Sequence, residues 1–162
     1  MPEKRTRERA AEDRREGKAS STQAGEFVRE EIHHVREGKH GARSPRQAIA
    51  IGLSKARRAG VKLQPPKKGK ASARTRRSAK SALKRAKSRR KPSARRSRAT
   101  HGALRREGRS AASKRSLGRH ARSAARARGP RARSKAARKA IHTKGPRARL
   151  AAARKAARTR AR

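Results

Sequence analysis

The chain of 162 residues contains 54 Lys or Arg and 10 Asp or Glu, which gives a formal net charge of +44. Hydrophobic residues make up 30% of it, mostly as alanine, and Phe27 is the one aromatic residue. A chain so charged cannot bury the apolar core of an enzyme-sized domain, and without cysteine it forms neither disulfides nor a cysteine zinc site. We expect no enzymatic activity and no cofactor.

Residues 1–21 mix both charges and hold no large apolar residue after Met1. They are predicted to be a flexible N-terminus, at most a frayed helix, because nothing in the pattern anchors them. The chain begins in charge rather than in an apolar stretch, so no secretory signal is expected. The longest apolar run, residues 48–53, is far shorter than the roughly 20 residues of a membrane span. We expect a cytoplasmic protein with no membrane partner.

Residues 22–64 hold nine large apolar residues and are predicted to form a helical hairpin. The first helix is indicated by apolar residues at helical spacing, namely Ala24, Val28, Ile32 and Val35, with Phe27 at the flank of this stripe. Ser21 or Thr22 can cap its start, and Gly38 suits the position after its end. A short connection, residues 38–43, joins it to the second helix.

The second helix is indicated by a capping sequence, in which Ser44 is the N-cap, Pro45 the first helical residue and Gln47 the third. Gly60 suits its end, with Val61 as the apolar residue that follows. The face of this helix carries Ile49, Leu53 and Ala56, and a ridge of small residues recurs every four positions at Ala48, Gly52 and Ala56. Because nine apolar residues make a thin core, we expect self-association through this ridge or folding on binding.

Residues 65–70 are predicted to be a linker, and residues 71–162 a basic low-complexity tail. The tail holds only five large apolar residues, too few to offset the ordering entropy of the backbone. It ends in a tandem repeat, residues 129–144 and 145–160, with eleven of 16 positions identical and a Gly-Pro opening each unit. The predicted fold class is therefore mostly α, a small helical hairpin head with a long, largely disordered Arg/Lys/Ala-rich tail.

The charge is divided unevenly along the chain. Nine of the ten acids lie in residues 1–37, where they balance nine basic residues, whereas residues 38–162 hold 45 basic residues and a single acid, Glu107. Such asymmetry is typical of a basic arm that binds a polyanion. A charge of +44 matches about 44 phosphates, or about 22 base pairs of duplex DNA. Arginine outnumbers lysine 37 to 17, and its guanidinium binds phosphate through two hydrogen bonds.

The predicted nucleic-acid contacts are paired or clustered basic residues beyond the first helix. They are Arg57, Arg58, Lys67, Lys68, Arg76, Arg77, Lys84, Arg85, Arg89, Arg90, Lys91, Arg95, Arg96, Arg105, Arg106, Arg131, Arg133, Arg138, Lys139, Arg147, Arg149, Arg154, Lys155 and Arg158. The tail has no aromatic residue on which a base could stack, so we expect binding without sequence readout.

One group of histidines, His33, His34 and His40, lies near Glu30 and Glu37 and could hold Zn²⁺ or Ni²⁺ weakly. Adjacent histidines point about 100° apart on a helix and do not share a face. Solvent-facing histidines are the favoured interpretation, so no metal site is expected.

Two resemblances follow from these residues. The tail resembles, in composition only, the C-terminal domains of linker histones and the bacterial histone-H1-like proteins. Residues 35–41 and 44–56 resemble a bacterial family of small basic proteins of unassigned function, some of them labelled DNA-binding or plasmid-stabilisation proteins. That resemblance covers about residues 22–64 and brings no catalytic residue.

We expect nonspecific, charge-driven DNA binding and compaction by a nucleoid-associated, histone-like protein. An RNA-binding or ribosome-associated basic protein is the first alternative, because arginine-rich tails also bind RNA. The second is a protein-interaction module in a plasmid-maintenance system.

Overall fold

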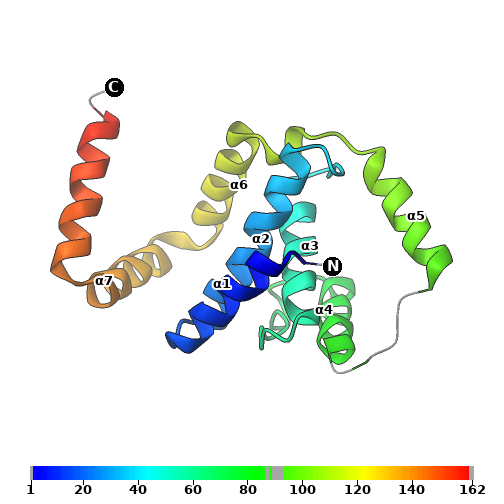
Figure 1. Ribbon diagram of the computed structural model, residues 1–162. Helices are drawn as coiled ribbons and strands as arrows, with labels where there is room; N and C mark the ends of the chain where they lie inside the picture. Colours follow the sequence, from blue (N-terminus) through cyan, green and yellow to red (C-terminus); the bar gives the residue numbers. More distant parts are fainter. Residues whose placement is uncertain (1, 87, 89–92, 161–162) are drawn as a thin grey trace. The chain divides into compact units, whose positions relative to one another are not determined.

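A computed structural model describes residues 2–86, 88 and 93–160, and these residues form seven α-helices and one 3₁₀ helix (Figure 1). The helices are α1 (Lys4–Arg15), α2 (Ser20–Arg36), α3 (Pro45–Arg58), α4 (Ala73–Ala86), α5 (Ala94–Arg105), η1 (Ser110–Ala112), α6 (Lys114–Ala127) and α7 (Gly129–Arg160). The chain divides into two compact units, residues 1–118 and 119–162. The first unit contains the buried side chains, and we call its residues 2–63 and 104–112 the head.

The N-terminus differs from the expected flexible segment, because α1 packs on α2. Ala10 is buried in the same apolar cluster as Ala24 and Phe27 of α2. Around that contact the backbone N–H of Glu3 donates to Glu30, and Arg9 lies 3.8 Å from a carboxylate oxygen of Glu26. Ala10, together with Thr6 and Asp13 one turn to either side, is buried and thus anchors a helix whose sequence offers no large apolar residue.

Helix α2 begins at Ser20, before either expected cap, and its N-cap Ala19 makes no side-chain hydrogen bond. The end is as predicted: Gly38 adopts a positive φ of 78°, and the N–H of Lys39 donates to the carbonyl of His34. Phe27 is 1% exposed and lies at the centre of the apolar face rather than at its flank. The buried face of α2 is therefore rotated, by about one residue position around the helix, from the face that the sequence predicted.

The signals at both ends of α3 act as predicted. The hydroxyl oxygen of Ser44 accepts from the backbone N–H of Gln47, whose side-chain oxygen in turn accepts from the N–H of Arg43. At the other end Gly60 has a φ of 92°, and Val61 is buried in the core.

The ridge of small residues on α3 packs inside the chain. Ala48 and Ala56 are fully buried, and a Cβ built on Gly52 would lie 2.7 Å from the Cα of Val28 and 2.9 Å from the carbonyl oxygen of Phe27. Helix α2 thus occupies the face that the sequence suggested for self-association. Small residues serve here to bring two helices of one chain into backbone contact.

A two-helix hairpin is too small a description of the first unit, so that prediction is wrong. Helix α4 packs on α3 through Ala79 and Ala82, and η1 packs on both α2 and α3. Ala111 and Ala112 of η1 are buried with Val35 in a second apolar cluster. Alanine methyls, which the sequence argument discounted, are sufficient where helices approach closely.

The connection at residues 38–42 binds the segment just before η1. The N–H of Gly41 donates to the carbonyl of Leu104, and the N–H of Ala42 donates to the carbonyl of Gly108. A Cβ on Gly41 would overlap the carbonyl group of Glu107, so only glycine fits at this close approach. Segments 60 residues apart in sequence are joined here.

The predicted long disordered tail is also wrong, because α4, α5, α6 and α7 order most of residues 73–160. Alanine, arginine, lysine and leucine all have high helix propensity, and a helix satisfies its backbone hydrogen bonds internally. Lack of a hydrophobic core therefore did not predict lack of secondary structure. Both repeat units are helical within α7, which breaks at Gly145 with a φ of 62°. Pro130 and Pro146 each follow a positive-φ glycine, at the position where a missing N–H is harmless.

Candidate nucleic-acid interface

Most of the predicted contact residues present exposed side chains, and most of these lie on helices rather than on a disordered tail; Lys67, Lys68 and Arg106 lie outside the helices. Those exposed are Arg58, Lys67, Lys68, Arg77, Lys84, Arg85, Arg95, Arg96, Arg105, Arg106, Arg131, Arg133, Arg138, Lys139, Arg149, Arg154 and Arg158. Arg89, Arg90 and Lys91 lie outside the described residues, as do the side chains of Arg147 and Lys155.

Arg57 is buried, unlike these exposed residues. Its side chain is 6% exposed, and its Nε donates to the carbonyl of Leu63 at 3.1 Å. The guanidinium thus fastens the segment after α3 onto that helix, and desolvation lowers its pKa. Adjacent basic residues on a helix point about 100° apart, so an Arg57–Arg58 pair cannot place both side chains on the same surface.

Arg58 of α3 and Arg85 of α4 repel each other electrostatically. Desolvation lowers the pKa of Arg58, repulsion from Arg85 lowers it further, and attraction by Glu31 opposes this shift. An arginine side chain does not release its proton at physiological pH, so the repulsion persists as an electrostatic cost. Half-buried Arg76, also on α4, has a buried Nε with no hydrogen-bond partner.

Helix α4 presents opposite faces to the core and to solvent. Ala79 and Ala82 are buried, whereas Arg77, Lys80 and Lys84 are exposed at i, i+3 and i+7. Residues at this spacing share one side of a helix. The packing of α4 on α3 therefore fixes which of its charges reach solvent.

Sequence reasoning missed a row of arginines on α6. Arg115, Arg119, Arg122 and Arg126 fall at i, i+4, i+7 and i+11, and all four side chains are exposed. The row places a guanidinium about every 5.4 Å along the helix. These arginines recur at helical spacing in the sequence, whereas the predicted contacts are mostly adjacent basic residues, which do not share a face of a helix.

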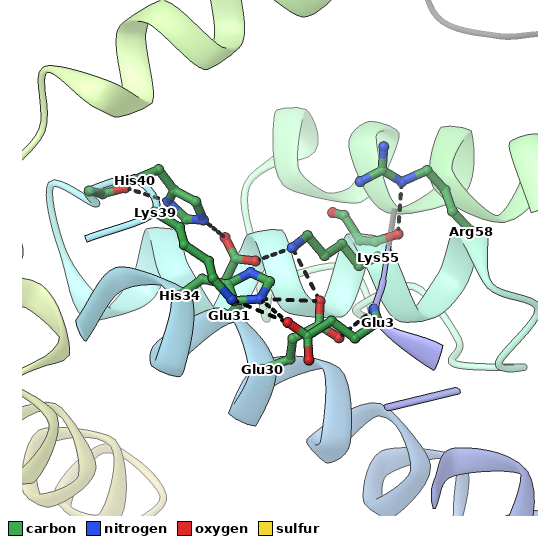
Figure 2. A network of polar contacts seen from close by, with 10 residues as sticks. Glu3, Glu30, Glu31, His34, Lys39, His40, Lys55 and Arg58 are labelled. Carbon is green, nitrogen blue, oxygen red and sulfur yellow. Dashed lines mark hydrogen bonds and ion pairs between the residues drawn. The ribbon is translucent and has the colours of Figure 1, made fainter. Parts of the chain in front are cut away.

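The head contains a second group of charges, which is partly buried and mixed in sign (Figure 2). Side chains of Glu30 and Glu31 on α2 are 2% and 0% exposed, and Lys55 of α3 lies 3.6 Å and 2.6 Å from them. At its edge Glu3 accepts hydrogen bonds from His34 and Lys39, which lower the pKa of its carboxyl. These acids are paired within the head and do not offset the charge of the later helices.

His33 is exposed as expected, but His34 and His40 are not solvent-facing. Their side chains are 12% and 15% exposed and point into this mixed-charge group. The i, i+1 offset turns one histidine outward and its neighbour inward, while the connection after α2 brings His40 back toward α2.

No described helix combines the length and the apolarity needed to cross a membrane.

Comparison with known proteins identifies similarity over one segment. Residues 15–68, a third of the chain, match a family of unknown function (DUF6496). The match covers α2 and α3 and includes the segment expected to resemble small basic bacterial proteins, but its description says nothing of DNA binding, plasmid stabilisation or histones. No curated protein and no solved structure matches the chain.

Proposed function

We propose that this protein binds nucleic acid without sequence preference, with duplex DNA as its principal ligand, and compacts it as a nucleoid-associated, histone-like protein. The observation that carries the proposal is the 45 basic residues against one acid after residue 37. Most of those described are exposed on helices. Neutralising phosphates releases condensed counterions, which supplies the free energy of sequence-independent binding.

Rows of basic side chains on α4 and α6 support this proposal. Each helix presents basic residues along one side, and helices fit the major groove or lie along the phosphate backbone.

The test is a salt titration of the intact protein with duplexes of unrelated sequence. If about ten phosphates are neutralised in each binding event, the slope of log affinity against log salt is about −9. Affinity then falls roughly 10⁵-fold between 50 and 200 mM salt, equally for every sequence. A slope shallower than about −3, or a strong preference for one sequence, contradicts charge-driven binding.

A second experiment separates DNA from RNA. Crosslinking in cells, followed by sequencing of bound DNA and bound RNA in parallel, should recover DNA spread broadly over the genome. Recovery dominated by ribosomal RNA overturns the DNA assignment in favour of the RNA-binding alternative. Recovery of neither, with the chain crosslinked to a protein, favours the interaction module.

A further inference from the structure

We propose that the head binds one divalent transition-metal ion, with Zn²⁺ the best fit, through Glu31, His34 and His40. One ligand atom from each of these side chains lies within 4.8 Å of the other two. Imidazole nitrogen with carboxylate oxygen is a donor set that suits zinc, and three protein ligands leave a fourth position for water.

The spacing of two ligands already matches a metal site. The Nε2 of His40 lies 3.2 Å from Oε1 of Glu31. Ligand atoms about 2.0–2.1 Å from a tetrahedral zinc are separated by about 3.3 Å, so an ion fits against this pair without rearrangement. His34 follows Glu31 by three residues on α2, the spacing that places two side chains on one face, and a side-chain adjustment completes the set.

Glu31 can accept a metal ion at one of its two carboxylate oxygens. Its side chain is fully buried, and its oxygens lie in ion-pair range of His40 and Lys55 without a hydrogen bond of good geometry. Lys55 lies 2.6 Å from Oε2, which leaves Oε1 for a metal ion. Glu30 and Glu31 are both buried and share one close ammonium, that of Lys55, while the charge of Arg58 also acts on Glu31. The two carboxylates therefore do not each have an ion-pair partner of their own, and a bound cation would add one.

His40 is oriented as a metal ligand (Figure 2). Its Nδ1 lies 3.0 Å from the carbonyl of Gly41, which can only accept, so Nδ1 carries the hydrogen and donates. This hydrogen bond directs Nε2 toward Glu31, the arrangement that a second partner imposes on a ligating histidine. The other neighbours are Glu3, whose Oε1 lies 2.9 Å from Nε2 of His34, and Lys39, which lies 3.3 Å from Glu3. His34 binds the ion through Nδ1 if it keeps its hydrogen bond to Glu3, and through Nε2 only if the metal replaces that hydrogen bond.

The site would join α2 to the connection that binds residues 104–108. His40 precedes Gly41, whose N–H donates to Leu104. A metal bound to the folded head but not to the unfolded chain stabilises the head, and small domains with thin cores commonly use such a link. The inference concerns the head and does not depend on nucleic-acid binding.

The experiment titrates the full chain, freed of nucleic acid, with Zn²⁺ by calorimetry and with Co²⁺ by visible absorption. We expect one ion per chain and a higher melting temperature. His33→Gln is the matched control, because His33 neighbours His34 but faces solvent, and its affinity should equal that of the native chain. His34→Gln and His40→Gln should each weaken Zn²⁺ binding at least 10-fold. Removing a residue that only hydrogen-bonds to a metal ligand already costs about 10-fold in affinity, so removing a ligand should cost no less.

Failure to saturate at one equivalent overturns the proposal, and so does equal weakening by His33→Gln and His34→Gln. Circular dichroism checks that each variant keeps its helices. If a ligand variant unfolds, the Co²⁺ spectrum of the native chain decides: four-coordinate absorption at one equivalent supports the site, and the aquo-ion spectrum alone overturns it.

Discussion

The head and the C-terminal helices both consist of α-helix, but they are stabilised differently. In the head, α1, α2, α3 and η1 bury side chains in two apolar clusters, and acidic residues there have basic partners. In residues 119–160 no described side chain is buried, and Ile141 and Leu150 are about half exposed. Tertiary packing stabilises the helices of the head. The helices of residues 119–160 instead depend on the helix propensity of their residues, and their surface is dominated by charge.

This contrast shows that secondary structure and a hydrophobic core are separable properties. Alanine and arginine favour a helix without any partner, so a core-poor segment can still be helical. The arginines of the C-terminal helices are also exposed, and Glu107 is the single acidic residue after residue 37. Few carboxylates in that part of the sequence can therefore compete with phosphate for these guanidinium groups. Removing charge and removing packing should therefore affect different properties.

The largest expected effect comes from neutralising arginines in the C-terminal helices. The variant carries glutamine at Arg119, Arg122, Arg126, Arg131 and Arg133, all of which are exposed. If each holds a phosphate, the salt slope of DNA binding becomes shallower by about 4.5, because each contact contributes about 0.9. Fluorescence anisotropy with a labelled duplex over a salt series measures this change.

The matched control makes the same change in net charge within the N-terminal region. It carries glutamine at five exposed residues, Lys4, Arg5, Arg7, Arg14 and Arg15. Acids surround these residues, so the slope should change by less than about one. Equal changes in both variants would mean that only total charge matters and that the two regions do not differ in binding.

Loss of packing in the head should follow Gly52→Ala. The new Cβ would lie 2.7 Å from the Cα of Val28, so α2 and α3 must separate. Overpacking of this kind costs roughly 1–3 kcal/mol of unfolding free energy. Chemical denaturation followed by NMR signals of the head measures it, and the DNA salt slope should stay unchanged.

Gly25→Ala provides the opposite control in the same pair of helices. Gly25 lies within α2, and a Cβ there meets nothing within 4 Å. Replacing a helical glycine with alanine should therefore stabilise the head by roughly 0.5–1 kcal/mol. A loss of stability here would show that the surroundings of α2 are tighter than the structure indicates.

A smaller and more local effect is expected from Gly41→Ala. The new Cβ would overlap the carbonyl of Glu107, which displaces residues 104–108 from the connection after α2. The amides of Gly41 and Ala42, which donate across this contact, should lose hydrogen-exchange protection while the middle of α2 keeps it. Gly108→Ala is the matched control, since that glycine has open space around its Cα, and its protection pattern should match the native one.

The smallest effect concerns Lys18. Hydrogen bonds to Asp13 and then to Glu16 raise the pKa of Lys18 in the folded chain. A raised pKa means that this stabilisation is complete below the unfolded value near 10.5 and is lost as pH rises through the folded value. Lys18→Gln should lower the urea midpoint slightly at pH 7, and the difference from the native chain should narrow above about pH 10.5. A difference that is constant with pH would exclude the ion pair as its source.

The sequence by itself determined where several helices begin and end, because those features depend on a few neighbouring residues. Ser44, Pro45 and Gln47 predicted the start of α3, and Gly38 and Gly60 predicted two helix ends, because caps and positive φ angles are set within a few residues. Composition alone likewise divided the chain into a balanced N-terminal region and a basic remainder.

Only the tertiary structure decided which of these features are buried and which are exposed. In the folded chain Arg57 points inward, and Glu31, His34 and His40 lie together. The small-residue ridge of α3 packs against α2 instead of a second chain. The tertiary structure also places Ala111 and Ala112 against Val35, although they lie more than 70 residues away in sequence. Alanine carries no strong pattern of its own, so its burial depends on how closely distant segments approach, and that distance is a property of the folded chain.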